Sequence, residues 1–551
     1  MTSRSLKTPL VAALTWPLPV GRSPLHVTCA CRTAAMAAAP EGGVSAPMLP
    51  AVILSARVDL DEVTIDQLQA HMAAGTLSAR ELVEAYLLRI EAIDRTGPTL
   101  RSIIEINPDA LAIADALDRE RANGHVRGQL HGIPIVIKDN IDTADRMQTT
   151  AGSLALAGSY AGADAPVAAR LRQAGAILLA KANLSEWANF RSTRSSSGWS
   201  GRGRQTRNPF VLDRSPGGSS SGSAVAVSAN LCVAALGTET DGSIMSPSSA
   251  SGVVGIKPTV GLTSRQGVVP ISHTQDTVGP HARTVADAAA VLSAVAESGE
   301  DYRQYLQADA LSGARIGIAR KFHTEYSEHT DRVFDQALEV LRQRGVELID
   351  DVEIPAHAQL RADLEGADVT AERLVLQYEF KAGIAAYLAT RPGAEMCTLA
   401  DLIHFNVEHA DQEMPYFGQE VFLQSEARGP LTDELYQRAL DHEMRFARGF
   451  AQLFEERGFA ALVAPTNAPA WAIDVLDGDR GLGGSAQAAA VSGFPLITVP
   501  AGFALGLLPL GLTFMGPPRS EPTLIKLAFA FEQASPVRRV PGFRPSTLDL
   551  P

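Results

Sequence analysis

The sequence is most distinctive over residues 214–229, which read RSPGGSSSGSAVAVSA. Adjacent glycines allow the backbone to adopt positive φ angles and to approach a ligand closely. The small apolar residues that follow predict a tightly packed helix beginning in this loop. A flexible Gly/Ser linker would not continue directly into an apolar segment, and the Lys-Ser/Thr ending of a phosphate-binding loop is missing. We therefore expect a loop that presents serine hydroxyls at the start of a buried helix.

A lysine ends an apolar run upstream of this loop. Residues 132–137 read GIPIVI, a β-branched stretch that predicts a buried strand, and Lys138 follows them. Burial disfavours the charged form of a lysine and lowers its pKa, so such an amine can act as a base. Taken alone, a lysine at a strand end is explained more simply by a side chain that extends to solvent.

A tight turn lies downstream of the serine-rich loop. Residues 232–236 read CVAAL and predict a strand, which leads into residues 237–244, GTETDGSI. Consecutive backbone N–H groups in such a turn can point at one oxygen, as in an oxyanion hole. An ordinary Asp-Gly turn would have the same sequence features, so the turn alone does not identify a nucleophile.

The three elements together indicate one kind of chemistry. A serine hydroxyl becomes nucleophilic when a nearby base takes its proton and N–H groups stabilise the oxyanion that develops. Lys138, Ser219 and Ser243 supply these groups in order along the chain. We therefore predict a hydrolase with a Ser-Ser-Lys catalytic triad.

The same elements, in this order and spacing, resemble the amidase signature family, over roughly residues 60–540. The resemblance implies that Ser243 is the nucleophile and Lys138 the general base. It implies that Ser219, on a cis peptide bond, relays the proton between them. It also implies an oxyanion hole formed by four backbone N–H groups, those of Thr240, Asp241, Gly242 and Ser243.

Two positions depart from the commonest pattern of the family. Ser221 and Asp241 stand where glycines are usual, and both are typical of one subgroup, the bacterial peptide amidases. The resemblance thus implies hydrolysis of C-terminally amidated peptides to the free acid and ammonia through an acyl-enzyme. Two alternatives stay open: a small aliphatic or aromatic carboxamide as substrate, or the amidase subunit of a tRNA-dependent amidotransferase.

The expected fold is α/β. Strand-like runs such as residues 176–180 and 461–465 alternate with helical stretches, a pattern typical of a sheet covered on both faces by helices. The family fold implies a large mixed β-sheet in a single domain. We expect an amidase domain over residues 59–551, with a helical, pocket-forming region around 300–450. Residues 1–58 read as a signal-like or disordered extension, so the sequence leaves open a cytoplasmic or an exported location.

Composition limits the partners of the chain. The net charge of −13 disfavours nucleic acid, and no apolar run is long enough for a membrane span. The four cysteines form no CxxC pair, and the histidines show no zinc spacing. We therefore expect no metal and no cofactor, a monomer, and a small molecule or peptide amide as substrate.

Overall fold

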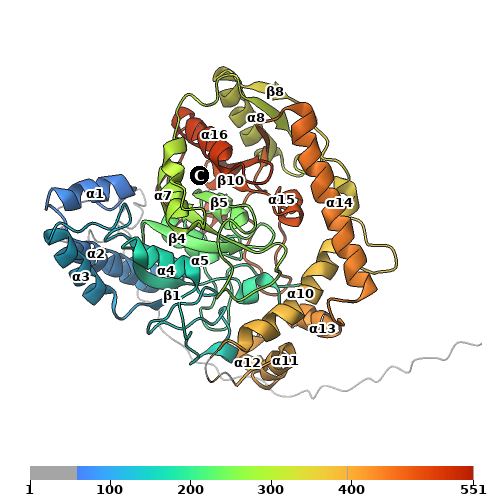
Figure 1. The fold of residues 1–551 in the computed structure, drawn as a ribbon, viewed down its shortest axis with the longest axis horizontal. Coiled ribbons are helices and arrows are strands. Elements are labelled where there is room, and N and C mark those ends of the chain that lie inside the picture. The colour runs from blue at the N-terminus through green and yellow to red at the C-terminus, as the bar shows by residue number, and fades with distance from the viewer. Residues whose placement is uncertain (1–58, 351, 392, 394, 550–551) are drawn as a thin grey trace, which may run out of the picture. The chain divides into compact units, whose positions relative to one another are not determined.

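The computed structural model describes residues 59–549, except residues 351, 392 and 394. Its centre is an 11-stranded sheet with the strand order β1-β3-β2-β4-β6-β5-β10-β11-β9-β7-β8. Helices pack around this sheet (Figure 1). The predicted fold class, a large mixed sheet with helices, is therefore confirmed. The expected extension over residues 1–58 lies outside the described residues.

The sheet combines parallel and antiparallel pairs. Strand β2 is parallel to both of its neighbours, β3 and β4, and β7 is parallel to β8 and β9, whereas the remaining pairs are antiparallel. The strands are β1 Ile103–Ile106, β2 Pro134–Lys138, β3 Ile177–Ala182, β4 Ala234–Glu239, β5 Val254–Lys257, β6 Thr277–Ala282, β7 Arg315–Ile318, β8 Glu347–Ile349, β9 Ala461–Pro465, β10 Leu496–Ala504 and β11 Leu508–Met515.

The helices of the first half cover the strands that carry the predicted site. Helix α5 contacts β2, β4 and β6, while α6 contacts β5, β10 and β11. These helices are α1 Ile65–Ala73, α2 Ala79–Arg89, α3 Ala110–Ala122, α4 Pro166–Gln173, α5 Ser221–Ser228, α6 Met245–Ala250 and α7 Val285–Val295.

The second half of the chain contributes longer helices. Helix α14 runs along one side of the view in Figure 1 and contacts α10 and α15. The helices are α8 Glu328–Gln343, α9 His357–Leu360, α10 Ala371–Leu388, α11 Leu399–Glu408, α12 Ala410–Glu413, α13 Glu420–Glu426, α14 Glu434–Arg457, α15 Gln487–Ser492 and α16 Glu521–Ala534. The region around 300–450 is therefore mainly helical, although β7 and β8 also belong to it.

The buried strands explain why the apolar runs could be recognised. All five residues of β2 are buried, because parallel strands on both sides and helices on the faces leave no solvent contact. The predicted run 133–137 thus forms β2, and Lys138 is its last residue. The runs 176–180 and 461–465 form β3 and β9.

Strand β4 ends later than the sequence predicted. The predicted strand stopped before Gly237, but pairing with β6 continues through Glu239. A Cβ atom at Gly237 would lie 2.7 Å from Ser220 Oγ and 2.4 Å from His281 Nε2. Glycine is therefore required here because the serine-rich loop packs directly on the strand.

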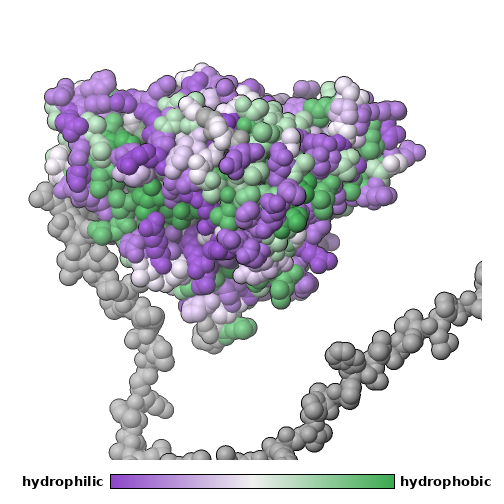
Figure 2. Space-filling model, turned by 90° about the horizontal axis from the view of Figure 1, so that it is seen from below, coloured by the Kyte–Doolittle hydropathy of each residue, from purple (hydrophilic) through white to green (hydrophobic). Residues whose placement is uncertain are grey.

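The molecular surface mixes hydrophilic and hydrophobic residues on the face shown in Figure 2. Exposed large apolar side chains such as Leu476, Leu482 and Leu548 belong to different segments. Scattered apolar residues of this kind are ordinary on protein surfaces. Within residues 59–549, no helix has both the length and the apolar character that crossing a membrane requires.

Candidate active site

Three segments bring the predicted catalytic residues to one place. Lys138 ends β2, Ser219 precedes α5, and Ser243 lies in the turn between β4 and α6. All three side chains are buried: Lys138 and Ser219 are 0% exposed and Ser243 is 8% exposed. The Gly218–Ser219 peptide bond is cis, as the resemblance implied.

The amine of Lys138 lies in a ring of oxygen atoms. Its Nζ is 2.8 Å from Ser219 Oγ, 3.0 Å from Ser220 Oγ and 2.8 Å from Thr238 Oγ1. No carboxylate within residues 59–549 forms an ion pair with it. The side chain therefore stays in the interior, and the alternative of a lysine extending to solvent is wrong.

Burial changes the proton affinity of this amine. Desolvation lowers the pKa of Lys138 to about 7, although the charges of Asp276 and Glu239 act in the opposite direction. The carboxylates do not restore the ordinary value because neither contacts the amine directly. A substantial fraction of Lys138 is therefore neutral near pH 7, as a general base must be.

Proton accounting distinguishes the two adjacent serines. Ser220 Oγ donates to the carbonyl of Thr238 at 3.0 Å and accepts from the Thr238 N–H at 3.2 Å. Its proton is thus committed to the β4 backbone, and it can only accept from Lys138. Ser219 Oγ, in contrast, has Lys138 as its one hydrogen-bond partner in the described part of the chain.

Thr238 completes the orientation of the amine. Its Oγ1 accepts from Asn140 Nδ2 at 3.0 Å and lies 2.8 Å from the lysine nitrogen. A neutral amine has two hydrogens and one lone pair. If Ser220 and Thr238 receive the hydrogens, the lone pair faces Ser219.

Ser243 is joined to the serine-rich loop through the backbone. Its carbonyl accepts the Ser220 N–H at 3.1 Å. Its hydroxyl makes no hydrogen bond to any residue of the described ranges. The structure thus brings Lys138 and Ser219 into direct contact and places Ser243 beside them, with its hydroxyl unengaged.

Glu239 holds the turn that carries Ser243. Its Oε2 accepts the N–H groups of Ile244 at 2.6 Å and Met245 at 2.9 Å, immediately after the nucleophile candidate. Burial raises the pKa of Glu239, whereas the charge of buried Lys257 lowers it. One carboxylate therefore fixes the end of β4, the turn and the start of α6 relative to one another.

The turn also leaves backbone donors free. Gly242 has a φ of 78°, and the N–H groups of Asp241 and Ser243 donate to no atom of the described residues. Thr240 is fixed by its hydroxyl, which donates to Asp276 Oδ1 at 2.6 Å. The conformation supplies unpaired N–H groups next to Ser243, as an oxyanion hole requires.

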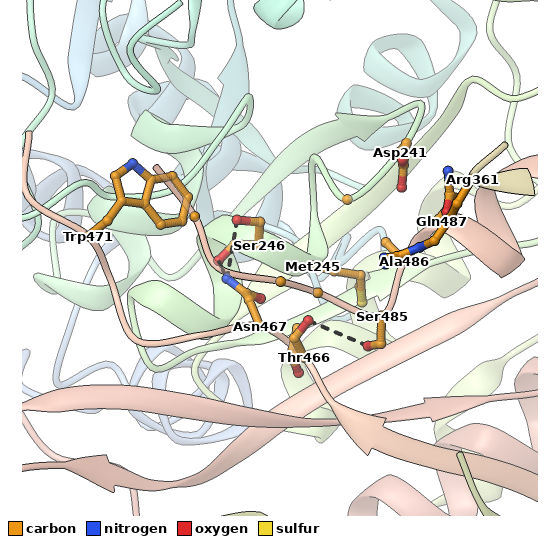
Figure 3. A pocket seen from close by; sticks show the side chains of 14 residues that line it. Asp241, Met245, Ser246, Arg361, Thr466, Asn467, Trp471, Ser485, Ala486 and Gln487 are labelled. Atoms are coloured by element: carbon orange, nitrogen blue, oxygen red, sulfur yellow. Dashed lines mark hydrogen bonds between the residues drawn. The ribbon is translucent and has the colours of Figure 1, made fainter. Parts of the chain in front are cut away.

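A cavity of about 570 Å³ begins at this turn (Figure 3). In this view, Trp471 lies at one end, Asp241, Arg361 and Gln487 lie at the other, and Ser246 and Asn467 lie between. A glycine-rich segment, residues 481–484, forms part of the wall. This volume is in the range of pockets that bind molecules larger than a simple carboxamide.

Carboxyl groups gather at one end of this cavity. Although the Asp241 side chain opens to the cavity, the surrounding protein desolvates it, and this together with the charges of Glu372 and Glu239 raises the pKa of Asp241 above its ordinary value. The Glu372 carboxylate accepts from Gln275 Nε2 and from Gln487 Nε2. Asp241 is therefore held in a polar environment that disfavours its charged form.

Residues suggested by the sequence for the pocket lie elsewhere. Tyr378, Glu379 and Phe417 are buried and are not in the wall of this cavity. Tyr378 packs on Tyr436 of α14 with ring centroids 5.5 Å apart. In residues 59–549, no group of three or more His, Cys, Asp or Glu side chains is arranged to hold a metal ion.

Comparisons with known proteins agree with this architecture. The model of the family described as "Amidase" matches residues 81–525. A probable amidase of Arabidopsis thaliana is 42% identical over 511 residues, covering 89% of this chain and 93% of that protein. The chain therefore belongs to the amidase family, and it is an amide hydrolase by that membership.

Solved structures and a second group of relatives give finer comparisons. The native peptide amidase of Stenotrophomonas maltophilia is 48% identical, with a TM-score of 0.82, covering 88% of this chain and 99% of that one. One component of the glutamyl-tRNA(Gln) amidotransferase of Chloroflexus aurantiacus is 36% identical over 499 residues, covering 86% of this chain and 97% of the relative.

Four residues of the site escaped the sequence analysis: Ser220, Thr238, Glu239 and Asn467. Ser220 and Thr238 flank residues that were singled out, but their roles depend on pairing between segments. Glu239 could have been noticed as a carboxylate at the end of an apolar strand. Nothing in the local sequence marks Asn467.

Proposed function

We propose that this protein hydrolyses C-terminally amidated peptides to the free acid and ammonia through Ser243, Ser219 and Lys138. The observation that carries the proposal is the direct contact between Ser219 Oγ and a lysine amine whose pKa is lowered to about 7. The similarity to a solved peptide amidase and the size of the adjoining cavity support the peptide substrate.

In the acylation step, Ser243 Oγ attacks the carbonyl carbon of the carboxamide. Its proton passes to Ser219 Oγ while the Ser219 proton passes to the Lys138 amine. The backbone N–H groups of Thr240, Asp241, Gly242 and Ser243 stabilise the oxyanion. The hydrogen bond between the two serines forms when the substrate is bound, because catalytic contacts tighten in the complex.

Collapse of the tetrahedral intermediate releases ammonia. The proton on Lys138 returns through Ser219 to the leaving nitrogen as the C–N bond breaks, which leaves an ester on Ser243. A water molecule then attacks this ester, gives its proton to the same relay, and the acid product departs. The amine is neutral again at the end of the cycle.

The proposal is tested with the purified protein and its Ser243→Ala variant. Each is incubated with a C-terminally amidated dipeptide and with the matching unamidated tripeptide, and ammonia and product mass are measured. We expect ammonia from the amidated peptide alone, and none from the variant. If both peptides are untouched while a simple aliphatic or aromatic carboxamide is cleaved, the peptide substrate is wrong and the small-amide alternative holds.

The second alternative rests on the relatives that are components of amidotransferases. Such a component functions in an assembly of several proteins, whereas we expect this chain to work alone as a monomer. Ammonia release by the purified chain supports the independent enzyme. Inactivity of the chain on every amide tested would favour the amidotransferase alternative.

A further inference from the structure

We propose that Asn467 is a specificity-determining residue whose side-chain oxygen accepts the backbone N–H of the substrate's C-terminal residue. This inference rests on the proposed hydrolysis of peptide amides and names the group by which a peptide would be recognised. It concerns the wall of the cavity rather than the reacting atoms.

The first observation is an unsatisfied acceptor. Asn467 is 5% exposed and lines the cavity, and its Oδ1 is buried without a hydrogen-bond partner in the structure. A buried polar atom in this state is costly, and such atoms are normally paired in the functional complex. A substrate that donates a hydrogen bond here would remove the cost.

The second observation fixes which end of the amide is unpaired. The Nδ2 atom of Asn467 lies 3.3 Å from Ser246 Oγ and 3.5 Å from the Ser246 carbonyl oxygen. A carbonyl can only accept, so the nitrogen must face Ser246. Figure 3 shows the amide nitrogen turned toward Ser246, with the oxygen on the other arm of the amide. The cavity is therefore offered an acceptor.

The backbone holds this acceptor firmly. Asn467 follows β9 and forms a bridge with Gly484 across the cavity wall. On either side of it, Ser485 N donates to Thr466 O, and Ala468 N donates to Gly483 O, both at 3.1 Å. A side chain on a paired segment keeps its position, which a specific contact requires.

The acceptor is also near the reacting centre. Ser246, which faces Asn467, donates its own N–H to the Gly242 carbonyl at 2.7 Å, next to Ser243. From there the cavity extends to Trp471, whose indole N–H is held by Asp479 at 2.9 Å. The cavity can thus receive the acyl part of the substrate, with a side chain against the indole.

In a peptide amide, the donor nearest to the scissile carbonyl on the acyl side is the N–H of the C-terminal residue. It lies one atom beyond the α-carbon, so it enters the cavity just behind the reacting carbonyl. A simple aliphatic amide has no such donor. Asn467 therefore favours peptide amides over simple carboxamides through one hydrogen bond.

The test uses two substrates that differ in this group alone. N-acetyl-phenylalaninamide carries the N–H, whereas O-acetyl-phenyllactamide carries an ester oxygen in its place, and both release ammonia on hydrolysis of the amide. We expect the wild-type kcat/KM to be about 10- to 100-fold higher for the substrate with the N–H, since a lost hydrogen bond also leaves Oδ1 unpaired.

In the Asn467→Ala variant, the ratio of the two kcat/KM values should fall to near one, mainly through a loss on the N–H substrate. Asn467→Asp keeps an acceptor and should keep a ratio above that of the alanine variant. Asn123→Ala, the same change at the exposed end of α3, should leave the wild-type ratio unchanged. Since each ratio is measured on one preparation, partial misfolding cancels.

The outcomes separate the two proposals. A ratio in Asn467→Ala equal to that of the wild type, or a wild type that does not distinguish the substrates, overturns the role of Asn467 and leaves peptide-amide hydrolysis standing. A wild type that releases ammonia from neither substrate overturns both proposals.

Discussion

At the scale of single residues, the two serines beside Lys138 are chemically different although they are adjacent in sequence. The Ser220 proton is engaged by the Thr238 carbonyl, while Ser219 has its proton available for transfer. A sequence comparison alone would not separate them. The distinction comes from the packing of the loop on β4.

This difference predicts the behaviour of two alanine variants. Ser219→Ala should lower kcat by about 10²- to 10⁴-fold because it breaks the proton path. Ser220→Ala should cost less, because Thr238 still orients the amine. Steady-state kinetics with an amidated dipeptide measures both. Equal losses in the two variants would contradict the assignment of the relay to Ser219.

The lowered pKa of Lys138 predicts the pH dependence of the reaction. A lysine with a pKa of about 7 is mainly neutral above that pH and protonated below it. Because the base must be neutral, kcat/KM should fall about tenfold for each pH unit below 7. A rate that stays flat down to pH 5 would exclude Lys138 as the base.

Asp241 gives a third residue-scale prediction. A charged carboxylate beside the oxyanion turn would repel a substrate carboxylate, so neutral amides would be preferred. Since the pKa of Asp241 is raised, its charge, and hence this preference, should grow with rising pH. The measurement compares an amidated peptide with its unamidated analogue across pH. Asp241→Gly should remove the trend, and an unaltered trend in this variant would disprove the idea.

At the scale of elements, Glu239 connects a strand, a turn and a helix. Its carboxylate holds the first N–H groups after Ser243, while Lys257 of β5 lies close enough to influence its charge. The orientation of the nucleophile therefore depends on a buried charged group behind the turn.

Replacing Glu239 by Gln should lower kcat about tenfold with little change in KM, because hydrogen bonds to a charged acceptor are roughly twice as strong as neutral ones. The readout is kcat per folded enzyme, with the folded fraction taken from thermal unfolding. A lower melting temperature with unchanged kcat would show that Glu239 supports the fold without positioning Ser243.

The extent of sequence-based prediction also becomes clear at this scale. The apolar runs identified β2, β3 and β9, and the Ser/Thr-x-x-Gln/Glu patterns marked the starts of α1 and α2 at Thr64 and Ser78. These signals are local. Asn467 and Thr238 act through contacts with distant segments, and β4 extends because β6 pairs with it, so neighbouring residues carried no trace of them.

At the scale of the whole molecule, buried carboxyl groups influence stability. Glu443 of α14 is 2% exposed, and its Oε1 has no hydrogen-bond partner in the structure. Burial, with the charges of Glu372 and Glu379, raises the pKa of Glu443 to about 9. The folded protein therefore keeps this proton at pH values where the unfolded chain releases it.

The sign of the effect on stability follows. A raised acid pKa costs stability increasingly as pH rises from 4.5 to about 9, roughly 3 kcal/mol at pH 7. Glu443→Gln removes this penalty, so its gain in free energy of unfolding over the wild type should be larger at pH 8 than at pH 5. Denaturant unfolding at both pH values measures it.

A matched control lies on the same helix. Glu455 is exposed, so Glu455→Gln should show the same pH dependence of unfolding as the wild type. If the difference between Glu443→Gln and the wild type is constant with pH, Glu443 does not hold a proton in the folded state.

The order of the site along the chain has an evolutionary consequence. Lys138, Ser219 and Ser243 belong to one central stretch, whereas the far wall of the cavity comes from residue 361 and residues 466–487. Chemistry and substrate choice are therefore encoded in separate portions of the gene. Recombination that exchanges the later portion between relatives could create new substrate ranges while inheriting an intact reaction centre.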